Sequence, residues 1–553
     1  MDPQLGVTAN TNRVYFIPAC TLKYKCVLDQ ISSLLSRNSS LAELNCFHII
    51  IVPKVLGLYD SILESRGLYG VVKLHTFSWE LMSLDDQLLS LELPFLFKQL
   101  FVEHNHSLLS SISMSIWSLF HITGKPKVMF SVGKLSSSVL DMLEIYNETY
   151  TRDFIDTNNS KEIGALIVID RNQDYASSLL TPATYSGLLS ELFNINCGHL
   201  DLNVKETKLK KGKLNFNDEP SGSSNTVMTL DSSIDNLYGE IKHRHFSEVL
   251  NVLSSKAKLL KNEDIKALGI QEIRHFVQTK LQQVTMFKQN LVNHVLACET
   301  VISEMSKKYE SLKLTETEML NNRNKKSNFT FVDENFGTDI HIYNSLRLMC
   351  LLSLTQGLSY DEYNTLVNKY LLAFGYKYLY VFNNLISAGL LVQPSSPKLS
   401  LNIPNLGNLS DRLPKWQNEF QIMANKLKQL PSQPDNVGNT SPSYVFNGGY
   451  VPLIAVLCNV LLTAVSMNEV MTKLAALPDL KIDVKSLAKL LKSDPNVGGY
   501  FPLKPKSVLV YVVGGVNYAE VAACDVVQIS VGGKIYIASD CIASGSDLMA
   551  ANT

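Results

Sequence analysis

The apolar run VLVYVVGG at residues 508–515 decides the fold of this chain. Six consecutive apolar residues, four of them valine, predict a strand buried on both faces, as in a parallel sheet that is covered by helices. The two glycines favour a tight turn into the helix-like segment 516–526. Because the preceding sequence is helical, this strand needs partners from a distant part of the chain.

Suitable partner strands occur among residues 1–200. Short apolar runs alternate there with segments of helical spacing, and the runs cover residues 14–17, 48–52, 71–74, 128–132 and 165–169. Each run reads as a strand buried on both faces, and the alternation predicts two parallel sheets. We expect residues 441–553 to complete the sheet that begins near Val128, which makes the second α/β domain discontinuous in sequence.

A helical insertion separates the two parts of that sheet. Residues 240–336 contain no proline and one glycine, and their apolar residues repeat at helical intervals. A strict seven-residue stripe runs through this region, at Val277, Val284, Leu291, Cys298 and Met305. The stripe predicts either an internal seam between two helices of a hairpin, which we favour, or a groove that receives another helix.

A second amphipathic segment, LPKWQNEFQIMANKLKQL, covers residues 413–430. It places an apolar stripe at intervals of four and three residues, namely Trp416, Phe420, Met423, Leu427 and Leu430. The remaining positions are mostly charged or amide residues, so we expect the helix to lie on a surface. The stripe either binds a partner protein or packs on its own domain.

Composition excludes several classes of function. The 553 residues include 50 Lys and Arg against 51 Asp and Glu, so no net field attracts nucleic acid or an anionic bilayer. Nine scattered cysteines without a CxxC pair are typical of a reducing compartment. No secretory signal is visible, and the uncharged segment 451–467 is interpreted as a buried core helix. We therefore expect a cytoplasmic protein.

The sequence contains none of the phosphate-loop, dinucleotide, nucleophile-elbow or zinc-protease motifs. Asp170, Arg171 and Asp174 follow a predicted strand, where they could bind a ligand, but we favour a structural salt bridge. His243 and His245 could bind a metal, but we favour a solvated helix face. We predict no enzyme activity, cofactor or metal; an α/β nucleotide-binding enzyme is the alternative.

Residues 170–193, DRNQDYASSLLTPATYSGLLSELF, resemble a signature of the Sec/Munc (SM) family of syntaxin-binding proteins. The resemblance is carried by Asp170, Arg171, Asp174, Tyr185, Gly187, Leu188 and Phe193. Four further segments resemble the thirty-three branch of the vacuolar protein sorting group, in its B-like form. They are FSWELMSLDDQLLSLELP from Phe77, SLRLMCLLSLTQGLSYDEY from Ser345, YVFNGGYVPL from Tyr444 and VLVYVVGGVNYAEVAA from Val508.

This resemblance implies an arch-shaped fold with two parallel-sheet α/β domains and a mostly helical inserted third domain. The expected boundaries are 1–94 for the first α/β domain, 95–228 and 441–553 for the second, and 229–440 for the helical domain. Within the helical domain, a SNARE-facing hairpin is expected at 235–320 and a second subdomain at 340–430.

The resemblance also implies a regulator of SNARE-mediated vesicle fusion and protein sorting in the endosomal and lysosomal pathway. The expected partners are syntaxin-type SNAREs and a Vps-sixteen-like or VIPAR-like subunit of a tethering complex, which would hold the protein on late endosome, lysosome or recycling endosome membranes. We expect Lys280, Lys288 and His294 to contact SNAREs and Trp416, Phe420, Met423 and Leu427 to contact the other partner. A structural scaffold without SNARE contact is the alternative.

Overall fold

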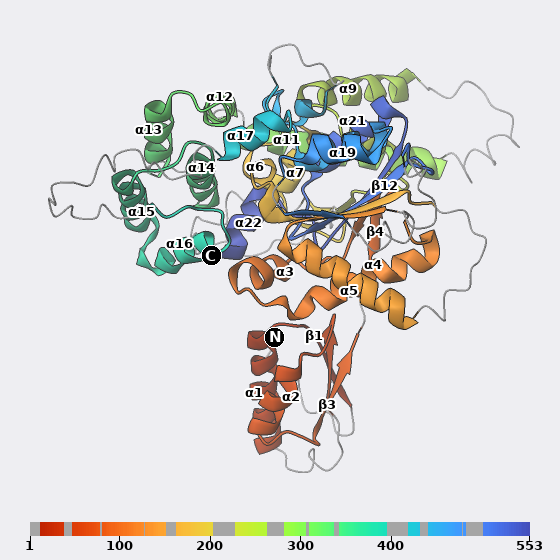
Figure 1. Ribbon diagram of the computed structural model, residues 1–553, viewed down its shortest axis with the longest axis vertical. Helices are drawn as coiled ribbons and strands as arrows, with labels where there is room; N and C mark the ends of the chain where they lie inside the picture. Colours follow the sequence, from red (N-terminus) through yellow and green to blue (C-terminus); the bar gives the residue numbers. More distant parts are fainter. Residues whose placement is uncertain are drawn as a thin grey trace, which may run out of the picture. The chain divides into compact units, whose positions relative to one another are not determined.

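The computed structural model divides into two compact units (Figure 1). Unit 1 comprises residues 1–81, 105–122 and 141–155, and unit 2 comprises residues 82–104, 123–140 and 156–553. The structure describes residues 12–37, 47–77, 80–126, 128–150, 162–202, 227–262, 281–305, 309–336, 342–394, 419–431, 441–477, 479–482 and 501–552.

Unit 1 contains a three-stranded parallel sheet in the order β1-β2-β3, formed by Arg13–Pro18, Phe47–Val52 and Val72–Thr76. Helices α1 (Thr21–Arg37) and α2 (Gly57–Ser65) pack on it, and the stacked rings of Tyr24 and Tyr59 lie 4.5 Å apart in its core. Val14 and Phe16 of β1 are 59% and 54% exposed. The prediction that this strand is buried on both faces is therefore wrong, because alternate side chains of β1 leave the core and face solvent.

Unit 2 contains a seven-stranded sheet in the order β11-β6-β7-β12-β13-β5-β4. Its strands are β4 (Met82–Asp85), β5 (Leu88–Ser90), β6 (Val128–Val132), β7 (Ala165–Asp170), β11 (Leu480–Ile482), β12 (Ser507–Val513) and β13 (Lys534–Ser539). Strands β6, β7, β12, β13 and β5 are parallel, whereas β4 and β11 run antiparallel at the two edges.

The pairing of β12 with β7 joins the late and early parts of the chain, with Val508 beside Ala165. All seven residues of β12 are buried. This confirms that the last part of the sequence completes the sheet that begins near Val128. Strands β4 and β5 precede residue 95, the expected start of the second α/β domain, yet they pair with the same sheet.

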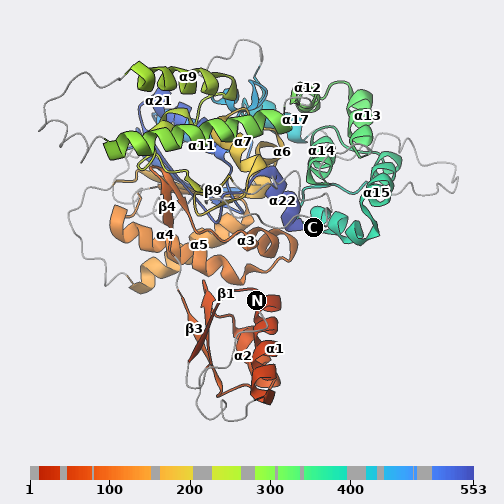
Figure 2. The same ribbon diagram turned by 180° about the vertical axis from the view of Figure 1, so that it is seen from behind.

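Helices cover this sheet on both faces (Figures 1 and 2). They include α3 (Phe95–Phe97), residues 134–140 of α5 (Lys134–Tyr150), α6 (Ala176–Leu179), α7 (Tyr185–Leu192), α18 (Leu453–Thr463), α19 (Met467–Leu474), α21 (Tyr518–Val531) and α22 (Gly545–Asn552), while the rest of α5 and most of α4 (Leu109–Thr123) belong to unit 1. Helix α18 contacts β12 and α21, and eight of its eleven residues are buried. The segment 451–467 thus contains a core helix, as predicted. None of the described helices is both long and apolar enough to cross a membrane.

The insertion between the two parts of the sheet is helical, as predicted. A small antiparallel sheet precedes it, formed by β8 (Ile195–Asn196), β9 (His199–Asp201) and β10 (Val227–Thr229). The described helices of the insertion are α8 (Asn236–Ile241), α9 (Phe246–Asn262), α11 (Leu281–Met305), α12 (Tyr309–Leu320), α13 (Lys325–Asn335), α14 (Ile342–Thr355), α15 (Tyr360–Phe374), α16 (Leu379–Ser387) and α17 (Glu419–Lys426).

Candidate functional site

The carboxyl ends of the parallel strands in unit 2 are the place where open α/β sheets usually bind ligands. Arg171 follows β7 there and donates two hydrogen bonds, of 2.7 and 2.9 Å, to the Glu520 carboxylate in the first turn of α21. Arg171 is 2% exposed and Glu520 0%. This buried pair confirms the structural salt bridge that the sequence favoured.

The carboxylates of the two aspartates in the motif also accept hydrogen bonds from other groups of the protein. Asp170 accepts hydrogen bonds from the Leu135 and Ser136 backbone amides at 2.9 and 2.7 Å. Asp174 accepts bonds from the Tyr450 hydroxyl at 2.9 Å and from the Leu453 amide at 2.8 Å, where α18 begins. A carboxylate at a helix N-terminus is stabilised by the helix dipole. These aspartates therefore hold neighbouring elements in place.

The glycine turn after β12 does not form an anion cradle. The Gly514 amide donates a 2.7 Å hydrogen bond to the Asp540 carboxylate, which also accepts a 2.6 Å bond from Tyr511. A Cβ atom at Gly514 would lie 2.5 Å from the Phe101 ring, so glycine is required by packing at this position. The Gly514 amide is therefore not available to donate a hydrogen bond to a phosphate.

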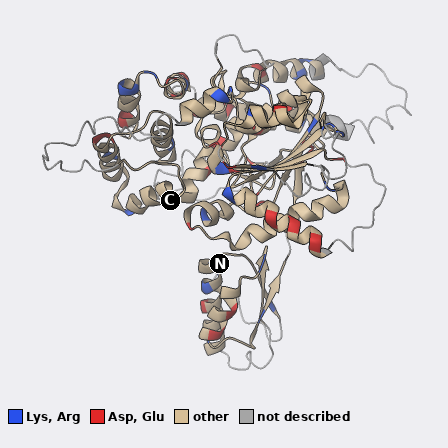
Figure 3. Cartoon of the chain, viewed as in Figure 1, with Lys and Arg blue, Asp and Glu red and all other residues tan. Residues whose placement is uncertain are grey.

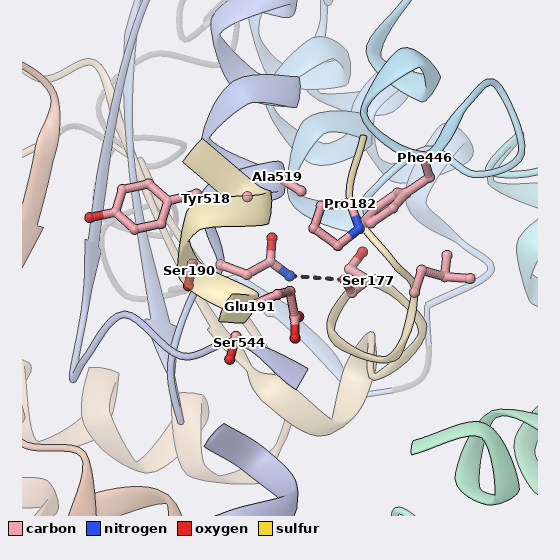
Figure 4. Close-up of a pocket in the computed structure, with 11 residues that line it drawn as sticks. Ser177, Pro182, Ser190, Glu191, Phe446, Tyr518, Ala519 and Ser544 are labelled. Carbon is pink, nitrogen blue, oxygen red and sulfur yellow. Dashed lines mark hydrogen bonds between the residues drawn. The ribbon is translucent and has the colours of Figure 1, made fainter. Parts of the chain in front are cut away.

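A nearby cavity between α7 and the start of α21 is too small for an organic ligand (Figure 4). Its lining includes Pro182, Glu191, Phe446 and Ser544, and its volume is about 10 Å³, which is room for roughly one water molecule. The dashed line in Figure 4 is the 2.9 Å hydrogen bond from the Asn517 side chain to the Ser177 carbonyl oxygen. The geometry at this edge of the sheet favours a structural role over substrate binding.

The histidines of the segment 243–245 are not on a solvated face, so that prediction is wrong. Both rings are half-buried, and His245 bonds to Ser247 at 2.7 Å and to Asn447 at 3.2 Å. Burial, together with the charge of Lys242, lowers the pKa of His243 to about 3, which keeps the ring neutral. Among the described residues, no group of three or more His, Cys, Asp or Glu could hold a metal ion.

Helix α11 carries two of the three expected SNARE-contacting residues, Lys288 and His294. Lys288 is exposed, whereas Lys280 lies outside the described residues. His294 is 0% exposed, and its two ring nitrogens bond to the Tyr185 hydroxyl at 2.8 Å and to the Asp235 carboxylate at 3.0 Å. The expected placement of His294 near a ligand is therefore wrong, because its polar atoms are satisfied inside unit 2.

The partners of His294 explain how α11 is anchored. Asp235 also accepts bonds from the Leu237 and Tyr238 amides at the start of α8. Burial opposes ionisation of Asp235, but the hydrogen bond and the charge of His294 hold its pKa below the ordinary value. The sequence offered one signal for this contact, the Tyr185 of the signature segment.

Two residues of the seven-residue stripe, Leu291 and Cys298, are buried on α11, and Met305 at the end of the helix is half-buried. Leu291 is 8% exposed and Cys298 0%, and α11 contacts α7, α8 and α9. Both residues thus belong to an internal seam, which was the favoured interpretation. Val277 lies outside the described residues, as does the side chain of Val284.

A different row of apolar side chains on α11 is exposed. It consists of Met286, Val292, Val295, Leu296 and Ile302, which are 36% to 52% exposed. Val292 precedes Val295 by three residues and Leu296 by four, and Ile302 follows Val295 by seven, which places these four residues on one side of the helix. This row does not stand out in the sequence, because the buried stripe is the more regular of the two.

Helix α17 packs on its own unit through part of the predicted stripe. Leu427 is 4% exposed, so its expected contact with a partner is wrong, and Phe420 stacks on Tyr450 with ring centroids 6.4 Å apart. Phe420 and Met423 are half-buried, Ile422 between them is 51% exposed, and Trp416 lies outside the described residues.

These features define the class of protein when they are compared with known proteins. A family model described as the Sec1 family matches residues 3–551, so the chain belongs to the Sec1 family. Solved structures with the same fold include the Unc18–syntaxin 1 complex from Monosiga brevicollis, with a TM-score of 0.54 and 13% identity over 100% of this chain and 96% of that one. Sly1p in complex with an N-terminal peptide of Sed5p gives a TM-score of 0.54 and 14% identity over 99% and 85%.

The chain is particularly similar to vacuolar protein sorting-associated protein 33B. It is 27% identical to the Rattus norvegicus protein over 442 residues, which cover 76% of this chain and 69% of the relative. Identity to the Danio rerio 33B protein is 25% over 89% of this chain and 79% of the relative. For protein 33A from Rattus norvegicus it is 25% over 89% and 78%.

The Arg171–Glu520 pair yields a stability prediction. We expect Arg171→Met to lower the free energy of unfolding by about 3–5 kcal/mol, because it leaves a buried carboxylate without its partner. Urea unfolding followed by circular dichroism measures this. Lys473→Met, which removes one half of an exposed pair with Glu469, is the matched control and should leave the midpoint unchanged. Equal midpoints for both variants would contradict the structural role.

Asp540 yields a prediction about pH. Burial raises its pKa to about 6, whereas an unfolded aspartate titrates near about 4. The folded state therefore binds an extra proton between these values, and the stability that this proton contributes is lost as the pH rises from about 4 to 6. We expect the stability of Asp540→Asn relative to wild type to increase over this range. A relative stability that is independent of pH would show that Asp540 does not titrate there.

Proposed function

We propose that this protein is an SM-type regulator of SNARE-mediated vesicle fusion and protein sorting in the endosomal and lysosomal pathway, and that it acts by binding rather than by catalysis. Membership of the Sec1 family and similarity to vacuolar protein sorting-associated proteins support this. Two proteins of the same fold were solved as complexes with syntaxin 1 and with the Qa SNARE Tlg2. The proposed location is on endosomal or lysosomal membranes, through partners.

The exposed row on α11 is the observation that carries this proposal. An amphipathic helix that packs along a second helix contacts apolar side chains at helical spacing on that second helix. Figure 2 shows α11 crossing unit 2 beside α9. Positively and negatively charged residues are interspersed along the described chain (Figure 3), which favours recognition by shape rather than by net charge.

SNARE capture should depend on the middle of this row. We expect Val292→Asp with Leu296→Asp to weaken binding of a syntaxin-type SNARE motif roughly thirtyfold, because loss of a central apolar anchor typically costs about 2 kcal/mol or more. Biolayer interferometry with the isolated motif measures the affinity. Leu314→Asp on α12, where the native side chain is 64% exposed, is the control and should bind normally.

Of the two lysines that are expected to contact SNAREs, Lys288 is the one that the structure describes. Lys288→Glu should weaken binding in the same assay and leave the thermal unfolding midpoint unchanged, since the side chain is exposed. If the α11 double variant and Lys288→Glu both bind the motif as wild type does, SNAREs do not use α11.

We also propose that α17 docks a Vps-sixteen-like or VIPAR-like subunit, as expected from the resemblance. The exposed Ile422 and the half-buried Phe420 and Met423 supply an apolar patch of the kind that anchors an interface. Gln421 donates a 2.6 Å hydrogen bond to the Leu320 carbonyl oxygen, which holds the helix on α12 and leaves Ile422 facing outward.

Ile422→Asp tests this docking site without disturbing the core. We expect a loss of roughly thirtyfold in affinity for the subunit, measured by co-purification and calorimetry, with SNARE capture and unfolding unchanged. Phe420→Asp with Met423→Asp should also abolish binding, but with lower stability, because both native side chains are half-buried. Leu372→Asp, at a 74% exposed site on α15, is the control. Normal binding by the Ile422 variant would rule out α17.

A further inference from the structure

A second cavity in unit 2 is large enough for a small ligand. It lies between the β4–β5 hairpin, helix α8 and helix α21, and has a volume of about 360 Å³. This volume falls within the range of roughly 300–1,000 Å³ that is typical of small-molecule sites. The proposed SNARE and partner contacts on α11 and α17 use none of its lining residues.

The charged side chains that line this cavity carry more negative than positive charge. Lys242 is the one Lys or Arg among the described lining residues, and it forms a 2.6 Å ion pair with Asp85. Asp86 and Asp525 also line the cavity, so two carboxylates exceed the available positive charge. His243 adds no charge, because its ring is neutral at physiological pH.

Asp525 is the carboxylate of this cavity for which the structure shows no structural role. It is half-buried, and within the described part of the chain it forms neither a hydrogen bond nor an ion pair. Asp85 differs, since it accepts bonds from Ser232 and Lys242. Burial raises the pKa of Asp525 although the nearby charge of Lys242 opposes this, which indicates that the carboxylate charge is poorly solvated there. A cation that binds beside such a carboxylate stabilises its charge, so binding is favourable.

Another part of the cavity is apolar. Ile535 and Ile537 of β13 are each 2% exposed and line it, together with Val521 of α21. A ligand that satisfies both parts needs an apolar stem and a positively charged end.

We propose that this cavity binds an alkylammonium or alkylguanidinium group, with the cation against Asp525 and Asp86 and the stem against Ile535 and Ile537. The same chemistry occurs in free polyamines and guanidines and in the Lys or Arg side chain of a protein. The inference is independent of SNARE capture, since it uses neither α11 nor α17.

Calorimetric titration of the full chain with butylguanidinium, and with the uncharged isostere butylurea, tests the proposal. We expect the cation to bind and butylurea to show no binding. Asp525→Asn should weaken cation binding about tenfold or more and leave the thermal midpoint equal or higher, because it removes a charge but no hydrogen bond. Glu310→Gln, at an exposed site on α12, is the control and should bind the cation normally.

Val521→Phe is a second variant that fills the cavity without changing its charge, and it should also abolish binding. The proposal is overturned if wild type binds no cation at millimolar concentration, if butylurea binds equally well, or if both variants keep wild-type affinity. Acetyl-Gly-Arg-Gly-amide distinguishes the sources: affinity equal to that of butylguanidinium supports a basic side chain of a protein, and binding of the free cation alone supports a small metabolite.

Discussion

The buried ion pair of Arg171 and Glu520 is the interaction on which the rest of unit 2 depends. It joins the carboxyl end of β7 to the first turn of α21 across 349 residues of sequence. Neither side chain has appreciable access to water, so each charge is tolerated only while the other is in place. The sheet that the first and last parts of the chain build together is thereby fixed at its centre, where β7 and β12 pair.

Further buried polar contacts attach the helical insertion to this centre. Arg347 of α14 lies 3.3 Å from Glu191 of α7 and 3.7 Å from Glu316 of α12, and His294 attaches α11 to Asp235. These contacts satisfy polar side chains inside unit 2. Within the described part of unit 2, the outside of the helices and the cavity beside α8 remain accessible.

Much of the fold could be predicted from the sequence, because strand and helix patterns are local. The β-branched run of β12, the core helix α18 and the helical insertion are all where the patterns predicted them. The structural roles of Asp170, Arg171 and Asp174 were favoured as well, since no catalytic motif accompanied them. The signature around these residues was also enough to indicate the family. Of the candidate contacts, Lys288 on α11 has an exposed side chain, and its contact with SNAREs stays a prediction.

The sequence by itself therefore determined the order of the elements and the family of the protein, while only the tertiary structure decided which faces are free. His294 is polar and sits in a helix, yet it is buried because Asp235 and Tyr185, 59 and 109 residues away, satisfy both nitrogens. Leu427 of the amphipathic segment is buried as well. An apolar row has the same spacing whether it faces its own domain or a partner. Burial depends on contacts between segments that are distant in sequence, and local periodicity contains no information about them.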